Sequence, residues 1–138
     1  MKKLILLFLA TTLVFTSCNK DDDSPSQDPF IGTWTSYKSF LNGEELELDD
    51  CDLQDSLVVN ADGTILQSYY YENEGTCELD GEDSATWENL GNSVYRITYS
   101  VDEVYEDKIT FEGNTFYVET SQTFNGETYT YKEVYIRN

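Results

Sequence analysis

The sequence predicts an all-β protein, an antiparallel up-and-down meander that closes into a small eight-stranded barrel. Three observations predict this fold class. After residue 29, no stretch of ten or more residues places apolar side chains at helical spacing. Segments rich in Tyr, Thr, Val, Ile and Phe recur instead, and these residue types fit a half-buried pleated sheet. Gly-containing pairs that suit tight hairpin turns separate the segments, at Asn42-Gly43, Asp62-Gly63, Gly91-Asn92, Gly113-Asn114 and Asn125-Gly126.

Each segment between two turns is a candidate strand. Alternation is clearest where Ile109 and Phe111 share one face while their polar neighbours share the other. Because tight turns join successive segments, we expect sequential strands to pair. Closure into a barrel would remove the exposed edges of such a sheet. The predicted strands span residues 31–41, 44–49, 55–60, 64–72, 84–90, 93–100, 106–112, 115–123 and 127–137.

Length and charge limit the possible functions. The chain has 138 residues, which suits one folded domain. Its 27 acidic and 8 basic side chains give a formal net charge of −19, which argues against a nucleic-acid partner because phosphates are neutralised by Lys and Arg. The chain contains no His, the commonest general base and zinc ligand. We expect a monomer without a cofactor.

The first residues predict export. Lys2 and Lys3 precede an apolar run that is too short to span a bilayer, and small residues follow it. This is the pattern of a secretory signal peptide, here over residues 1–17, and a retained anchor helix is the alternative. Residues 18–29 lack the apolar side chains of a core and predict a flexible acidic tether. The folded domain is expected over residues 30–138.

A cysteine follows the predicted signal peptide directly. Thr16-Ser17-Cys18 resembles the lipobox of bacterial lipoproteins, in which the cysteine is lipidated and becomes the first residue of the mature protein. The next residues, 19–23, resemble the acidic surface-export signal of lipoproteins of the Bacteroidetes group. The resemblance implies an outer-membrane lipoprotein exposed at the cell surface. Its membrane contact would be the lipid on Cys18, because several acyl chains together give firm attachment.

Two further cysteines, Cys51 and Cys77, form an even pair in a chain that is predicted to be exported. We therefore expect a disulfide between them. In the chain-entropy account, closing a loop of this length stabilises a fold by roughly 3 kcal/mol. The alternative is a reactive thiol, but the sequence places no Lys, Arg or His beside either cysteine to stabilise a thiolate.

The first predicted strand begins with a Gly-x-Trp motif, Ile31-Gly32-Thr33-Trp34. Together with the meander of hairpins, this motif resembles lipocalin-like domains, calycin-type β-barrels that occur in secreted lipoproteins. Further stretches resembling the family lie at residues 55–64 and 87–92. The resemblance covers residues 30–138 and implies that Gly32 and Trp34 form the base of the barrel beneath Arg137. It also implies that the barrel binds or carries a small hydrophobic or amphipathic molecule.

Acidic side chains cluster at residues 44–52 and 78–83. Paired carboxylates can cleave glycosides, and clustered carboxylates suit Ca²⁺. However, the clusters lack EF-hand spacing, the chain has no motif for a nucleophile or a phosphate loop, and a charge run is usually a solvated face. We predict no enzyme and no dedicated metal site, with Ca²⁺ binding at the acidic loops as an open alternative.

Tyrosine is abundant, with 11 residues. We predict Tyr69, Tyr71, Tyr95 and Tyr99 as inward-facing ligand-binding residues, an assignment that a one-residue slip in register would reverse. Rows of Tyr suit a wet cavity wall because a buried hydroxyl needs a partner. The alternatives are tyrosines that pack across strands and an exposed platform for sugars. A filled barrel would make the protein a non-catalytic surface module that docks to a protein or glycan.

Overall fold

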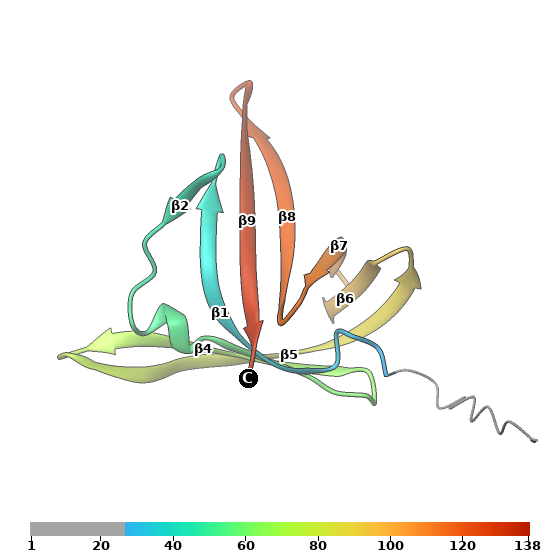
Figure 1. Cartoon of the computed structure of the whole chain (residues 1–138), viewed down its shortest axis with the longest axis horizontal. Coiled ribbons are helices and arrows are strands. Elements are labelled where there is room, and N and C mark those ends of the chain that lie inside the picture. Colours follow the sequence, from blue (N-terminus) through green and yellow to red (C-terminus); the bar gives the residue numbers. More distant parts are fainter. Residues whose placement is uncertain (1–26) are drawn as a thin grey trace, which may run out of the picture.

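The computed structural model describes residues 27–138, which form nine strands and one short 3-10 helix (Figure 1). The predicted signal peptide, Cys18 and most of the predicted tether lie outside the described residues. Within residues 27–138, no helix has the length and apolar character needed to cross a membrane. The elements are β1 (Gly32–Leu41), β2 (Glu44–Leu46), η1 (Asp52–Gln54), β3 (Ser56–Val59), β4 (Thr64–Asn73), β5 (Thr76–Gly91), β6 (Val94–Ser100), β7 (Glu103–Glu112), β8 (Thr115–Phe124) and β9 (Glu127–Arg137).

The strands form one antiparallel sheet that closes on itself. From β3 to β9 each strand pairs with the next in sequence, and β1 pairs with both β3 and β9. Eight strands thereby complete a closed barrel, while β2 continues the sheet beyond β1. This topology confirms the predicted fold class.

The turns alternate between the two ends of the barrel. We call one end the closed end; it contains Phe30, Arg137 and the turns at residues 60–63, 91–93 and 113–114. We call the other end the open end; it contains the turns at residues 42–43, 74–75, 101–102 and 125–126. Figure 1 shows the β8–β9 turn far from the C-terminus, and the β4–β5 hairpin reaching out sideways.

The strand β5 differs most from its prediction. The sequence predicted a strand over residues 84–90, but β5 begins at Thr76 and includes the acidic run 78–83, which we had placed in a loop. Its backbone pairs with β4 as far as the turn, so ladder hydrogen bonds hold a segment whose side chains are mostly exposed. Alternation of apolar residues is absent from that run, and periodicity therefore gave no strand signal. Smaller differences are that β2 ends at Leu46 and β7 begins at Glu103.

The apolar core lies at the closed end. Phe30, Trp34, Ile109 and Phe116 are almost completely buried. The Phe116 ring meets Trp34 edge-on at 4.7 Å between ring centres and Phe30 at 5.5 Å. Such edge-to-face pairs add stability beyond the apolar area that they bury. The core residues come from both ends of the described chain and hold the barrel together there.

Cys51 and Cys77 form the predicted disulfide, with 5.3 Å between their Cα atoms. Cys51 precedes η1, and Cys77 lies in β5 beside the turn at residues 74–75. The bond therefore ties the β4–β5 hairpin to the segment before β3. In that segment, one carboxylate oxygen of Asp49 accepts hydrogen bonds from the backbone N–H groups of Cys51 and Asp52 at 2.7 and 2.8 Å. Part of the first acidic cluster thus satisfies backbone groups.

Candidate ligand cavity

Trp34 lies at the centre of the floor that closes the barrel. Its indole Nε1 donates a hydrogen bond to the carbonyl oxygen of Phe30 at 2.9 Å. The guanidinium carbon of Arg137 lies 4.1 Å from the centre of the Trp34 ring, and its nitrogens donate to the carbonyl oxygens of Pro29 and Ile31 at 2.6 and 2.9 Å. A Cβ on Gly32 would lie 2.5 Å from Nη1 of Arg137. Gly32 also has a φ of +150°, which residues with a side chain rarely adopt, so the close contact and the backbone together favour glycine at this position.

Asp28 seals the floor through three hydrogen bonds. Its Oδ1 accepts from the Phe30 N–H and from the Tyr95 hydroxyl, both at 2.9 Å, and its Oδ2 accepts from the Asn89 amide at 2.6 Å. Burial and the hydrogen bond to Asp28 raise the pKa of Tyr95 well above its usual value. The hydroxyl therefore remains a neutral donor, and Tyr95 belongs to the floor.

Above the floor lies a cavity of about 560 Å³. Along β7, the lining runs from the apolar Ile109 next to the floor to Asp107, Tyr105 and finally Glu103 near the open end. The wall is therefore apolar below and polar above. The other apolar lining residues are Phe30, Leu57, Ile97, Phe116 and Val118, and the other polar ones are Gln67, Tyr69, Asp83, Ser84, Tyr99, Thr120, Glu133 and Tyr135.

Three tyrosines from different strands line the cavity: Tyr69 and Tyr99 stand in the upper wall, and Tyr135 stacks on Phe116 with 4.9 Å between ring centres. The Tyr99 hydroxyl donates to Oε1 of Gln67 at 2.8 Å, and the Tyr135 hydroxyl donates to Glu133 at 3.1 Å. Burial, followed by the neighbouring Tyr99 and Asp83, raises the pKa of Tyr69 to about 12. Burial, followed by the negative charges around it, also raises the pKa of Tyr99. All three therefore present neutral hydroxyls and aromatic faces to the cavity at neutral pH.

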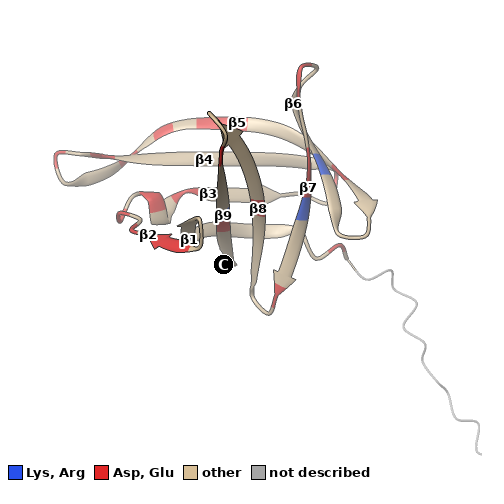
Figure 2. Ribbon diagram, turned by 90° about the horizontal axis from the view of Figure 1, so that it is seen from above, with Lys and Arg blue, Asp and Glu red and all other residues tan. Residues whose placement is uncertain are grey.

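The charged side chains of the lining are all acidic. They are Asp83 from β5, Glu103 and Asp107 from β7, and Glu133 from β9, and no Lys or Arg of the described chain lines this cavity. Figure 2 shows Asp and Glu recurring along β5 and around β2. An adjoining recess of about 220 Å³ does include Lys38, but its ammonium lies 3.1 Å from Glu45.

The comparison with known families agrees with the floor and the barrel. The family model of the lipocalin-like domain matches residues 30–116, from the buried Phe30 to Phe116. The chain belongs to the lipocalin-like domain family. No curated protein matches the sequence significantly. Lipocalin-like domains are in general ligand-binding and non-catalytic barrels.

The lipocalin-like barrel brings together only two of the four predicted ligand-binding tyrosines. Tyr69 and Tyr99 line the cavity. Tyr95 has the same inward direction on β6 but lies in the floor, where it is 2% exposed. Tyr71 lies beyond the cavity near the tip of the β4–β5 hairpin, and its hydroxyl donates to Glu78 at 3.3 Å. Ligand binding by these four tyrosines stays a prediction, and the structure places only Tyr69 and Tyr99 where they could contact a ligand in the cavity.

Sequence reasoning missed the acidic lining of the lipocalin-like cavity. Glu133 and Tyr135 lie two residues apart on β9, so both point inward, and this spacing is visible in the sequence. Asp83 carried no such signal, because its strand was predicted to begin after it. Within residues 27–138, the structure holds no group of three or more acidic or Cys side chains arranged to bind a metal ion.

Proposed function

We propose that this lipocalin-like domain binds a small amphipathic molecule inside its barrel. The single observation that carries the proposal is the cavity, whose volume of about 560 Å³ falls within the range of small-molecule sites. Its apolar lower wall suits a hydrocarbon or aromatic group. Its upper wall of tyrosines, carboxylates and an amide suits a polar head. A ligand with both parts fits this gradient from floor to open end.

We further propose that the protein is exported and anchored at the outer-membrane surface by lipid on Cys18. The lipobox-like sequence supports this proposal. Nine residues lie between Cys18 and Asp28, and Asp28 seals the closed end. The lipid would thus attach to the closed end of the barrel, and the cavity would open on the side away from the attachment. Replacing Cys18 by Ala should move the protein from the membrane to the soluble fraction, and continued membrane fractionation would contradict lipidation.

A docking module is the second candidate function, and one observation favours it. Large apolar side chains stand exposed at the open end, notably Val101 at 92%, Phe124 at 69% and Leu79 at 50%. These side chains belong to three different hairpins, those of β4–β5, β6–β7 and β8–β9, and exposed apolar groups are one mark of a contact surface. They lie outside the cavity lining, so docking and ligand binding make separable predictions.

The test is binding of a neutral amphipathic dye, N-phenyl-1-naphthylamine, to the full chain carrying Cys18→Ala. We expect saturable fluorescence enhancement with one site per chain. Val118→Trp, which places a larger ring in the cavity, should weaken binding about tenfold or more. The control is Tyr117→Trp, the adjacent outward-facing position on β8, which should leave the affinity within about twofold. Absence of dye binding by a correctly folded chain would contradict the cavity proposal and favour docking.

A further inference from the structure

The cavity of this chain has a charge that the lipocalin-like fold does not require. A hydrophobic or amphipathic ligand needs only an apolar wall, which Ile109, Phe116 and Val118 supply. Above them stand the four carboxylates of Asp83, Glu103, Asp107 and Glu133, which we call the acidic wall. They come from three strands, β5, β7 and β9, so the barrel fold itself brings them to one space.

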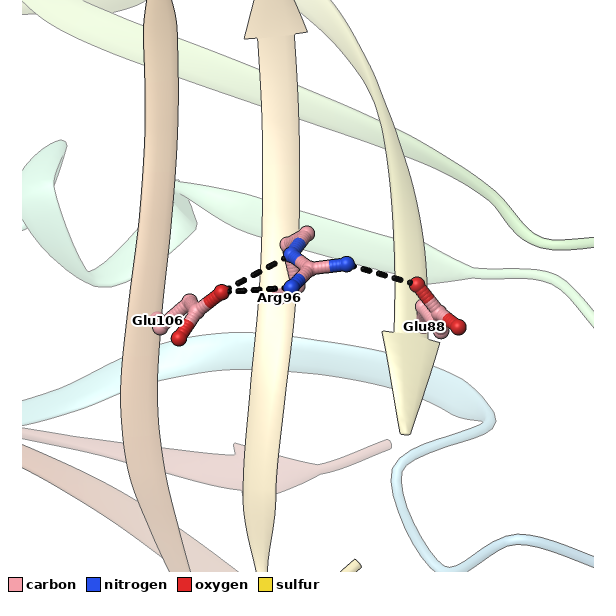
Figure 3. A network of polar contacts seen from close by, with 3 residues as sticks. All are labelled: Glu88, Arg96 and Glu106. Atoms are coloured by element: carbon pink, nitrogen blue, oxygen red, sulfur yellow. Dashed lines mark hydrogen bonds and ion pairs between the residues drawn. The ribbon is translucent and has the colours of Figure 1, made fainter. Parts of the chain in front are cut away.

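Several acidic side chains outside the cavity have structural partners that explain them. On the outer face, Arg96 bridges Glu88 and Glu106 at 3.1 and 2.7 Å (Figure 3). Asp28 and Asp49 accept hydrogen bonds from backbone N–H groups. The Arg96 guanidinium compensates the charge of two glutamates, and the two aspartates supply acceptors that the backbone N–H groups need.

In the acidic wall, the side-chain partners of Glu103 and Glu133 within residues 27–138 are neutral tyrosines. Glu133 accepts from the Tyr135 hydroxyl at 3.1 Å and Glu103 from the Tyr105 hydroxyl at 3.2 Å. No ion pair within residues 27–138 involves any of the four carboxylates. Asp83, Glu103 and Glu133 are exposed to solvent, and Asp107 is partly exposed. A ligand that fills the cavity displaces water from these carboxylates, and a cationic group compensates their charge better than a neutral hydrogen-bond donor does.

Aromatic faces accompany the carboxylates. The rings of Tyr99 and Tyr105 lie 6.1 Å apart in an edge-on arrangement, and Tyr69 and Tyr135 face the same space. Aromatic faces attract ammonium groups through their negative quadrupole. The outer surface of this barrel already shows the geometry, since the Lys132 ammonium lies 3.8 Å from the centre of the Tyr117 ring.

We propose that the cavity binds a small organic cation, an amine or quaternary ammonium that carries an apolar group. The apolar group rests on the floor between Ile109 and Phe116, and the cationic head lies among the tyrosines and the acidic wall. We propose an organic cation and not a metal ion because no cluster of three or more acidic or Cys side chains in the described residues is arranged to hold a metal ion. This inference rests on the proposed function and names the class of ligand for the same cavity.

The test compares three ligands of equal shape and different charge by titration calorimetry. They are 4-phenylbutylamine, 4-phenylbutanol and 4-phenylbutyrate, added to the full chain carrying Cys18→Ala. We expect the amine to bind about tenfold or more tightly than the alcohol, and the carboxylate to bind most weakly. Equal or tighter binding of the alcohol or the carboxylate overturns the inference while leaving the proposed function intact.

Matched variants separate the acidic wall from the net charge of the protein. Glu133→Gln should weaken amine binding about fivefold to tenfold and leave alcohol binding within about twofold. The control is Glu119→Gln, the same change at an exposed position on β8 outside the cavity lining, which should leave both affinities unchanged. Equal effects of the two variants would overturn the inference. If the naphthylamine dye binds but the amine does not, the inference fails alone, and if neither binds, the proposed function fails with it.

Discussion

The closed and open ends of the barrel are built from the same strands, yet they differ in almost every physical property. At the closed end, aromatic rings are buried, the indole and guanidinium groups donate hydrogen bonds to main-chain carbonyls, and the Asp28 carboxylate accepts from the Phe30 N–H, the Asn89 amide and the Tyr95 hydroxyl. At the open end, Val101 and Phe124 stand in solvent. No buried side-chain nitrogen or oxygen in residues 27–138 lacks a hydrogen-bond partner. The buried core therefore lies at the closed end, and the polar part of the cavity wall lies toward the open end.

The largest expected effect is at the centre of the floor. Trp34→Ala removes a buried ring and leaves the Arg137 guanidinium without its stacking partner, so the free energy of unfolding should fall by about 3–5 kcal/mol. Tyr37→Ala, an exposed position on the same strand, should cost less than about 1 kcal/mol. Urea unfolding followed by circular dichroism measures both. Similar losses for the two variants would contradict a floor that dominates stability.

Toward the open end, the disulfide between Cys51 and Cys77 is expected to stabilise the fold. Replacing Cys51 and Cys77 together by Ser should lower the free energy of unfolding by roughly 3 kcal/mol, because the unfolded chain regains the freedom of the loop between them. Amide hydrogen exchange should quicken mainly in the β4–β5 hairpin, while the floor keeps its protection. Faster exchange around Trp34 instead would show that the two ends are coupled.

The same substitution at Arg137 in the floor and at Arg96 on the outer face compares how much each arginine contributes to stability. Arg137→Lys loses the planar contact with Trp34 and one or both hydrogen bonds to the main chain, so it should cost about 1–2 kcal/mol. Arg96→Lys on the outer face should cost at most about 0.5 kcal/mol, because its ion pairs are exposed to solvent. The shift in urea midpoint for each variant checks this order. Equal costs would mean that Arg137 does not lock the floor.

The smallest expected effect is a pH dependence of the cavity wall. The pKa of Tyr69 is raised to about 12, so its contribution to stability is complete below the pKa of an unfolded tyrosine, near 10. That contribution should be lost as the pH rises from about 10 to about 12. Ultraviolet absorbance of phenolate, recorded with circular dichroism, should show Tyr69 ionising later in the wild type than an exposed tyrosine. In Tyr69→Phe, the late-ionising fraction should shrink, and an unchanged titration would contradict the assignment.

Much of the architecture could be predicted because turn chemistry and the Gly-x-Trp motif are local. Asn-Gly and Asp-Gly pairs marked hairpins, and the pairing of Trp34 with Arg137 followed from the family resemblance. Depth along the barrel could not be predicted. Alternation tells which face a side chain joins but not how far it lies from the floor, and so Tyr95 and Tyr71 were both assigned to the cavity.

The acidic wall was missed for a related reason. Its members are far apart in sequence, and the pairing of β4 with β5 over the acidic run was not predicted. Composition made every carboxylate look alike, with 27 of them in the chain. Only the closed sheet distinguishes Glu133, which faces the cavity, from Glu119, which lies on the opposite face of the neighbouring strand.

The pairing of β1 with β9, which closes the barrel, affects the order in which the chain can fold. The hydrogen bond from Arg137 to Ile31 joins residues 106 positions apart, and the pairing of β1 with β9 needs a strand from the far end of the barrel sequence. A chain that emerges from its N-terminus, whether from a ribosome or through an export channel, cannot complete the floor until β9 has emerged. Distant pairings of this kind make barrels fold slowly. The N-terminal strand therefore waits longest for its partner, and translocation in an unfolded state is compatible with this order of events.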